Sequence, residues 1–286
     1  MNILIIGMCG NSLFFEKETN VLLNEEPGGK GYNQAVGIAK LGGKVSFLGA
    51  IGNDISGNKC SDYLDYLNIK NLLIRKNECT TYANIYVDKY GNNDVHVFFG
   101  AKLDLSDLDY IKSQIDEHDL IMLQNEIEID LNVEIIKYIN KSKKKLLVNP
   151  APIASWMSKY LEMIDFITPN EIEARKLFNI PETIETSEIG NYLVNLKVNN
   201  VLVTLGSYGS VLVKDEQCQY FPSIKVHAID TTGAGDLMNA CLAYGLQNMM
   251  SLEEAVRLGT KACAHSVTKR FVLDSYPTLL DINKIQ

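Results

Sequence analysis

Short apolar runs alternate with helical repeats over most of the chain. The runs predict buried strands at residues 2–6, 44–48, 120–123, 146–148, 166–168, 201–205 and 210–213. Apolar residues at helical spacing predict a helix that ends at Leu41 and helices over residues 55–67, 131–140, 171–178, 237–246 and 252–267. Strands that alternate with helices in this way are typical of a mostly parallel sheet covered on both faces. Ligands of such sheets bind at the carboxyl ends of the strands.

Residues 80–100 follow a different pattern. Polar and apolar residues alternate from Tyr82 to Asp88, and a second apolar run follows the turn-forming residues Tyr90–Asn93. A Gly/Asn turn between two such segments predicts a β hairpin with one face open to solvent. We therefore expect a small β flap here, separate from the main sheet. Residues 8–27 are expected to form a polar, irregular connection.

Length and charge narrow the possible functions. The 286 residues suit a single α/β domain over residues 1–286, with 46% apolar and 22% charged residues. The net charge of −8 disfavours nucleic acid as a partner, because a phosphate backbone is bound mainly by cationic side chains. The sequence has neither a signal-peptide pattern nor an apolar run long enough for a bilayer. We therefore expect a cytoplasmic protein without a membrane partner.

The stretch Asp230–Asp236 gives the strongest chemical signal. Its small residues Gly233, Ala234 and Gly235 stand where an apolar helix begins, so backbone N–H groups are left uncovered. A helix N-terminus offers unpaired donors and a partial positive charge, which makes it an anion site. Because a carboxylate would repel a phosphate, Asp236 suggests a base that takes a proton from an attacking hydroxyl. The structural alternative is an Asp cap on a core helix.

A second glycine-rich stretch, Gly28–Asn33, also precedes a predicted helix. Its glycines permit a tight turn and a close backbone approach. Lys30 and Asn33 can donate to a hydroxyl or a phosphate. We interpret the stretch as a ligand site rather than as a structural turn alone.

Further polar groups follow the other predicted strands. Asn170 and Glu173 stand three residues apart at a helix start, where they can form a capping box and where one carboxylate can also serve Mg²⁺. The segment Thr204–Gly209 contains two glycines after a strand, and Glu126 ends another strand. Each of these signals is weak when taken alone.

Together these motifs resemble those of the ribokinase-like (PfkB) carbohydrate kinases. Asp230–Asp236 matches D-T-x-G-A-G-D, and the stretch that begins at Gly28 matches G-G-K-G-x-N-Q-A. Asn170–Glu173 matches N-x-x-E and Thr204–Gly209 matches T-x-G-x-x-G, all in the family's order. The resemblance implies a three-layer α/β/α fold with a small β lid from about 12–28 and 80–100. It also implies ATP-dependent phosphorylation of a hydroxyl on a sugar or sugar-like molecule, with Asp236 as general base.

The resemblance also assigns roles to individual residues. The anion hole would be Gly233, Ala234 and Gly235, and the substrate would contact Gly29, Lys30, Asn33, Glu126 and Asp236. ATP would contact Asn170, Thr204, Gly206, Gly209 and Gly235. Mg²⁺ would be handled indirectly by Asn170 and Glu173, and a monovalent cation would lie near Asp230 and Thr232. We therefore expect Mg²⁺, ATP as co-substrate and activation by K⁺.

The sequence departs from the family's pattern at three places. Gly10 and Ser12 stand where ribokinases carry the N-x-D pair that binds ribose hydroxyls. The connection from Ser12 to Gly28 is short, so we expect the lid to have lost a hairpin or part of one. Since this lid commonly closes the sugar site and often mediates dimers, both closure and a homodimer are in question. Phe271 stands where the cation-binding loop usually has Gly.

Two alternative functions stay open, and two others are disfavoured. The missing N-x-D pair also suits a nucleoside or pseudouridine kinase of the same fold. A non-catalytic sugar- or nucleotide-binding regulator would keep the fold, although the intact Asp236, Asn170 and Glu173 argue against it. An NAD-dependent enzyme is disfavoured because the turn at Gly7–Gly10 lacks G-x-G-x-x-G. A P-loop kinase is disfavoured as well, since the sequence has no G-x-x-x-x-G-K-[ST].

Overall fold

The central strand β1 (Ile3–Ile6) is buried on both sides in the computed structural model, which describes residues 1–87, 93–198 and 200–285. Ile3 and Ile5 belong to a core with residues of helices α1, α7 and α8, whereas Leu4 and Ile6 belong to a second core with residues of α3, α4 and α6. Successive strand side chains point to opposite faces, so each face of the sheet builds its own core. The expected three-layer α/β/α fold is confirmed.

The central sheet is mostly parallel, as predicted. Its nine strands have the spatial order β15 (Gln217–Phe221), β14 (Ser210–Lys214), β13 (Val201–Thr204), β12 (Phe166–Ile167), β11 (Lys145–Asn149), β10 (Leu120–Gln124), β1, β4 (Val45–Leu48) and β6 (Lys70–Asn71). Only the pairs β13–β14 and β14–β15 within it are antiparallel. A separate two-stranded sheet pairs β5 (Ala50–Gly52) with β7 (Ile74–Lys76).

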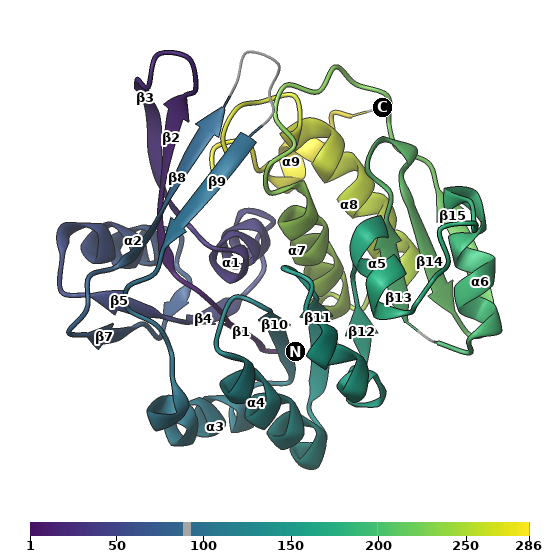
Figure 1. The fold of residues 1–286 in the computed structure, drawn as a ribbon, viewed down its shortest axis with the longest axis horizontal. Coiled ribbons are helices and arrows are strands. Elements are labelled where there is room, and N and C mark those ends of the chain that lie inside the picture. The colour runs from purple at the N-terminus through teal and green to yellow at the C-terminus, as the bar shows by residue number, and fades with distance from the viewer. Residues whose placement is uncertain (88–92, 199, 286) are drawn as a thin grey trace.

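Helices cover both faces of this sheet (Figure 1). They are α1 (Lys30–Lys40), α2 (Ile55–Tyr66), α3 (Leu108–Asp116), α4 (Ile129–Ser142), α5 (Glu171–Leu177), α6 (Ile189–Asn195), α7 (Ala234–Gln247), α8 (Leu252–Ser266) and α9 (Leu279–Ile282). The predicted helices form with shifts of a few residues at their ends. The sequence analysis did not predict α3, α6, α9 or the strands β5, β6, β7 and β15.

A four-stranded flap stands beside the main sheet, with the order β3 (Leu22–Gly28), β2 (Gly10–Glu16), β8 (Thr81–Val87) and β9 (Asn93–Phe98) (Figure 1). β8 and β9 are the antiparallel pair predicted from the alternating pattern. The predicted turn at Tyr90–Asn93 falls largely on residues 88–92, which lie outside the described residues.

The prediction of an irregular connection over residues 8–27 is wrong, and so is the expectation that the lid has lost a whole hairpin. β2 and β3 form an antiparallel hairpin there, and β2 also pairs in parallel with β8. The strand partner of Gly10 is Thr81, a residue far away in the sequence. The hairpin contains short apolar runs, at Leu13–Phe15 and Val21–Leu23, but polar residues border them. Since one face of β2 also stays partly exposed, the pattern of a buried strand is absent.

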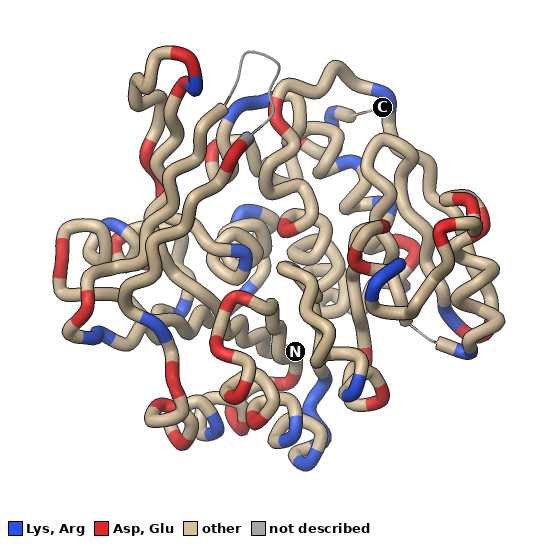
Figure 2. The backbone as a smooth tube through the Cα atoms, viewed as in Figure 1, with Lys and Arg blue, Asp and Glu red and all other residues tan. Residues whose placement is uncertain are grey.

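Charged residues of both signs lie mostly around the periphery of the molecule (Figure 2). The carboxyl ends of the central strands carry only a few charges, and these form the site described below. None of the helices in the described part of the chain is long and apolar enough to cross a membrane.

Close packing between α1 and β1 leads to a stability prediction. An ideal Cβ on Gly31 would lie 2.6 Å from Gln124 Oε1 and 3.2 Å from Gly7 Cα. Because Gln124 is buried and hydrogen-bonded, it cannot move aside. We expect Gly31→Ala to lower the free energy of unfolding by about 1–3 kcal/mol in urea titrations. Gly235→Ala is the control, since no atom lies within 4 Å of its added methyl; equal stabilities of the two variants would contradict the prediction.

Candidate active site at the N-terminus of α7

The α7 helix begins at the predicted anion-binding motif. Gly233 is the N-cap residue with φ of 75°, a left-handed conformation that favours glycine. Ala234 N donates a long hydrogen bond of 3.3 Å to Thr231 O, which closes the turn before the helix. Next to it, no atom lies within 4 Å of the ideal Cβ position of Gly235, so the backbone is open on that side. The motif therefore presents an accessible helix N-terminus.

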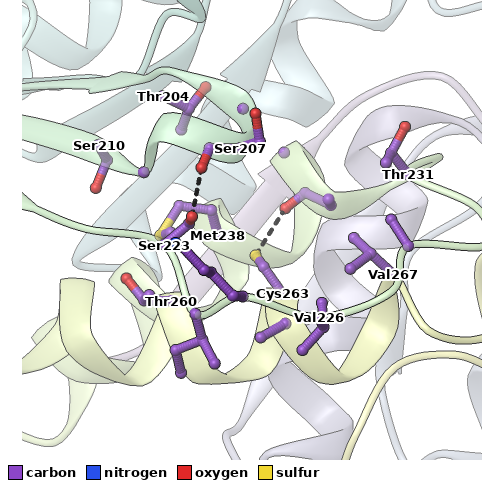
Figure 3. Close-up of a pocket in the computed structure, with 18 residues that line it drawn as sticks. Thr204, Ser207, Ser210, Ser223, Val226, Thr231, Met238, Thr260, Cys263 and Val267 are labelled. Atoms are coloured by element: carbon purple, nitrogen blue, oxygen red, sulfur yellow. Dashed lines mark hydrogen bonds between the residues drawn. The ribbon is translucent and has the colours of Figure 1, made fainter.

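A cavity of about 650 Å³ opens on one side of this helix start (Figure 3). Four of the predicted ATP contacts, Thr204, Gly206, Gly209 and Gly235, are among its lining residues. Apart from Lys225, the other lining residues are small or apolar, namely Ser207, Ser210, Ser223, Ile224, Val226, Ala228, Thr231, Ala234, Met238, Thr260, Cys263, Ala264 and Val267. An apolar cavity of this volume with a few polar groups is typical of a small-molecule site.

Asp236 faces the other side of the helix start and is 6% exposed. Its Oδ2 accepts a hydrogen bond of 3.0 Å from Asn33 Nδ2, and its Oδ1 accepts one of 3.3 Å from Gln34 Nε2. Both donors come from the first turns of α1, which the glycine-rich stretch opens. The structure thus joins the two main motifs of the sequence through one carboxylate.

A chain of buried amides extends from this carboxylate across the sheet edge. Gln34 Oε1 accepts from Gln124 Nε2 at 2.8 Å, and Gln34 Nε2 also donates to Asn149 Oδ1 at 3.3 Å. On α7, Asn239 Oδ1 accepts from Thr168 Oγ1 at 2.6 Å, while Asn239 Nδ2 donates to Gly235 O at 2.9 Å. These bonds fix α1 and α7 relative to the ends of β10, β11 and β12.

The sequence analysis gave no role to Gln34, Gln124, Asn149, Thr168 or Asn239. Gln124 and Asn149 follow predicted strands, Thr168 ends another, and Gln34 belongs to the glycine-rich motif, so their positions were a usable signal. Asn239 follows Asp236 by three residues, which places both near one face of α7. Only the three-dimensional arrangement shows that these side chains meet.

Lys30 is the cation among the acidic groups of the site. Its backbone N–H donates to Glu126 Oε2 at 2.7 Å. The charge of Asp236, followed by those of Glu126 and Glu173, raises the pKa of Lys30 although its burial opposes this. Burial raises the pKa of Asp236, and the charge of Lys30 partly counteracts this. Burial likewise raises the pKa of Glu126, to about 7.

Asn170 and Glu173 form the capping box of α5. Asn170 Oδ1 accepts from Glu173 N, and Glu173 Oε2 accepts from Asn170 N, both at 2.8 Å. Asn170 also forms a β-bridge with Thr204, which brings it beside the cavity without lining it. Burial raises the pKa of Glu173, and the charge of Lys30 acts against this. The predicted capping box is thus present, and the Glu173 carboxylate lies close enough to the site to raise the pKa of Lys30.

Asp230 is held by backbone donors on two sides. Its Oδ1 accepts from Thr232 N at 2.9 Å and its Oδ2 from Phe271 N at 3.1 Å. Phe271 has φ of 67°, so the residue that replaces the usual Gly keeps the left-handed backbone. A cation at Asp230 would have to use the remaining lone pairs of a carboxylate that is already hydrogen-bonded.

Gly10 and Ser12 lie in β2 of the flap, next to β8 and β3. An ideal Cβ on Gly10 would lie 2.6 Å from Thr81 O, so the backbone of β8 fills the space of a side chain. Ser12 Oγ would lie 2.4 Å from an ideal Cβ on Gly28. The backbone of β8 therefore leaves no room for a side chain at Gly10, and Ser12 fills the space beside Gly28.

The comparisons with known proteins agree with this geometry. Residues 6–279 match the family model described as pfkB family carbohydrate kinase. The chain is a member of this family. A deoxyribokinase from Salmonella typhi is 32% identical over 266 residues, which are 90% of this chain and 86% of the relative.

Two solved structures extend the comparison. A ribokinase from Thermotoga maritima is 33% identical with a TM-score of 0.86, covering 98% of this chain and 97% of its own. An Arabidopsis thaliana ribokinase, solved with ribose and ATP, is 25% identical with a TM-score of 0.83, covering 99% of both chains. The chain is accordingly a sugar kinase, a phosphotransferase with an alcohol group as acceptor.

The kinase should show a pH-dependent stability that traces to Glu126. The folded state binds the Glu126 proton up to a pH of about 7, whereas an unfolded glutamate releases it near its ordinary value of 4.5. Glu126 therefore makes the wild type lose stability as the pH rises through this window, and Glu126→Gln lacks this contribution. We expect urea unfolding to show a larger stability of Glu126→Gln relative to wild type at pH 8 than at pH 5. For Glu182→Gln, an exposed position, the stability difference from wild type should be the same at both pH values. A pH-independent difference for Glu126→Gln would contradict the prediction.

Proposed function

We propose that the kinase transfers the γ-phosphoryl group of ATP to a sugar hydroxyl that Asp236 deprotonates. The observation that carries this proposal is the position of the α7 N-terminus between the cavity and the Asp236 carboxylate. Ala234 and Gly235 line the 650 Å³ cavity, whereas Asp236 faces α1 on the other side. A nucleotide in the cavity and a hydroxyl beside Asp236 would then meet at backbone N–H groups. Such preorganised donors stabilise the charge that develops on a transferring phosphoryl group.

The acceptor side is built from α1 and the end of β10. Lys30 and Glu126 provide a cation and a carboxylate, and the Gly29 backbone begins the helix between them. Asn33 donates to Asp236, while its buried Oδ1 has no hydrogen-bond partner among the described residues. This oxygen can accept a hydrogen bond from a sugar hydroxyl. The hydroxyl groups of a polyol would thus find both hydrogen-bond donors and hydrogen-bond acceptors at this site.

ATP and cations fit the donor side of the site. Thr204, Gly206 and Gly209 would contact the nucleotide, and Asn170 stands next to Thr204. Glu173 would hold Mg²⁺ indirectly, since Mg²⁺ prefers oxygen ligands and keeps several waters. Bound Mg²⁺ would neutralise phosphate charge during transfer. Asp230 and Thr232 supply the negative charge and the oxygens that a K⁺ ion near the anion hole would need.

The substrate is proposed to be a pentose or deoxypentose. Relatives of similar length are a deoxyribokinase and ribokinases, which supports this class. Since the β8 backbone occupies the space beside Gly10, one hydroxyl-binding group of ribokinases has no counterpart here. A site without that group has less reason to reject a sugar that lacks the matching hydroxyl. Uridine, pseudouridine and adenosine test the nucleoside-kinase alternative.

Asp236→Asn tests the role of the base. We expect turnover to fall about 10²–10⁴-fold, because a positioned general base contributes that much, while ATP binding is kept. ADP release from Mg-ATP would be measured with and without K⁺ on ribose, 2-deoxyribose, fructose and the three nucleosides. Binding of ADP to the variant, measured by calorimetry, is the control for an intact cavity. Undiminished turnover of the variant would refute the assignment, and ADP binding without any wild-type turnover would favour a non-catalytic regulator.

We further propose a homodimer that forms through the outer face of the flap. Aromatic pairs cover this face: Tyr82 stacks on Phe98 with ring centroids 4.8 Å apart, and Phe15 stacks on Tyr86 at 5.4 Å. Tyr82 and Phe98 are 36% and 46% exposed, so a second copy could bury them. Phe98→Asp should shift the molar mass in light scattering from dimer to monomer. Tyr66→Asp, another exposed aromatic position, should not; a monomeric wild type would refute the dimer.

A further inference from the structure

Glu26 is a buried carboxylate that the proposed transfer reaction does not use. It lies in β3 of the flap and is 7% exposed. Its Oε1 accepts a hydrogen bond of 2.8 Å from Val272 N, and its Oε2 accepts one of 3.3 Å from Leu273 N. Burial raises the pKa of Glu26 to about 7, while these two backbone donors favour its charged form. The flap is thus bound to a loop near the end of the chain, which we call the C-terminal loop (residues 271–276).

The backbone of this loop is held in an unusual conformation. Phe271 has φ of 67°, which bulky side chains rarely adopt, and its N–H donates to Asp230 Oδ2 at 3.1 Å. Its ring packs edge-on against Phe14 of β2, with centroids 5.2 Å apart. The flap therefore contacts the loop twice, through Glu26 and through Phe14.

The other end of the loop contacts the anion-binding motif. Val272 Cγ1 lies 2.5 Å from the ideal Cβ position of Gly233, so its side chain packs directly on that residue. Tyr276 Oη donates a hydrogen bond of 2.8 Å to Gly233 O. Lys40 of α1 also donates to Leu273 O and Tyr276 O. The loop consequently fixes the position of Gly233, the residue from which α7 begins.

We propose that Glu26 is a positioning residue for phosphoryl transfer, because it fixes the C-terminal loop that in turn aligns the α7 N-terminus. The inference rests on the proposed function of Gly233–Gly235 as anion hole. Catalysis depends steeply on alignment, and a displacement of about 1 Å can cost about 10²-fold in rate. The flap then contributes to the anion hole in addition to covering the acceptor side.

Glu26→Ala tests this link through the separation of kcat from KM. We expect kcat to fall at least about tenfold, with the KM values for sugar and Mg-ATP within about threefold of wild type, because alignment in the transition state is lost while both ligands still bind. Glu26→Gln keeps a carbonyl oxygen for the Val272 N–H and should recover most of kcat. The matched control is Glu25→Ala, a neighbour that pairs instead with Lys59 at 2.6 Å and should keep wild-type kcat.

The outcomes separate this inference from the proposed function. Wild-type turnover that Asp236→Asn abolishes establishes the function whatever Glu26 does. A Glu26→Ala enzyme with unchanged kcat, or with a rise in KM alone, would overturn the positioning role. If Glu26→Ala does not fold, Tyr276→Phe cuts the same link at its other end, and an unchanged kcat there would overturn the role as well. A wild type without turnover on any sugar would remove the basis of both proposals.

Discussion

The structure depends on the hydrogen bonds that hold the Asp236 carboxylate in the interior. A buried charge is costly unless it is paired and hydrogen-bonded, and here Asn33 and Gln34 donate to both of its oxygens. Gln34 is itself fully buried and is oriented by Gln124. The network thus ties α7 and α1 to the end of β10. It fixes the geometry of the site before any ligand binds.

The excess of negative charge explains why this network is needed. Asp236, Glu126 and Glu173 act on one lysine, Lys30, and burial raises the pKa of each of the three acids. In the proposed function, Asp236 and Glu126 would accept hydrogen bonds from a sugar hydroxyl, whereas ATP would bring further negative charge. The N-terminus of α7 would then supply partial positive charge on the side of the cavity. The proposal thus assigns Asp236 and Glu126 to the acceptor, and the backbone donors to the phosphate.

The sequence predicted the layers and the two main motifs because both are local properties of the chain. Apolar runs give the strands, and the glycines of Gly28–Asn33 and Gly233–Gly235 shape helix starts where they stand. The meeting of the supporting amides could not be predicted, because Gln124, Asn149 and Asn239 come from different elements and share no spacing. The flap hairpin was missed for a similar reason: β2 pairs with β8 across a long stretch of chain. Local motifs show which residues can take part in chemistry, whereas contacts between distant segments set the positions of their side chains.

Phe271 shows how a departure from a family pattern can be understood physically. The left-handed backbone at this position would cost a glycine little, whereas it strains a phenylalanine by about 1–3 kcal/mol. The ring offsets this cost by packing against Phe14, and the N–H of Phe271 is bound by Asp230. A glycine would relieve the strain but would lose the contact with the flap. Phenylalanine at this position therefore strains the backbone but links the flap to the C-terminal loop. Glu26 strengthens the same link from the neighbouring strand β3.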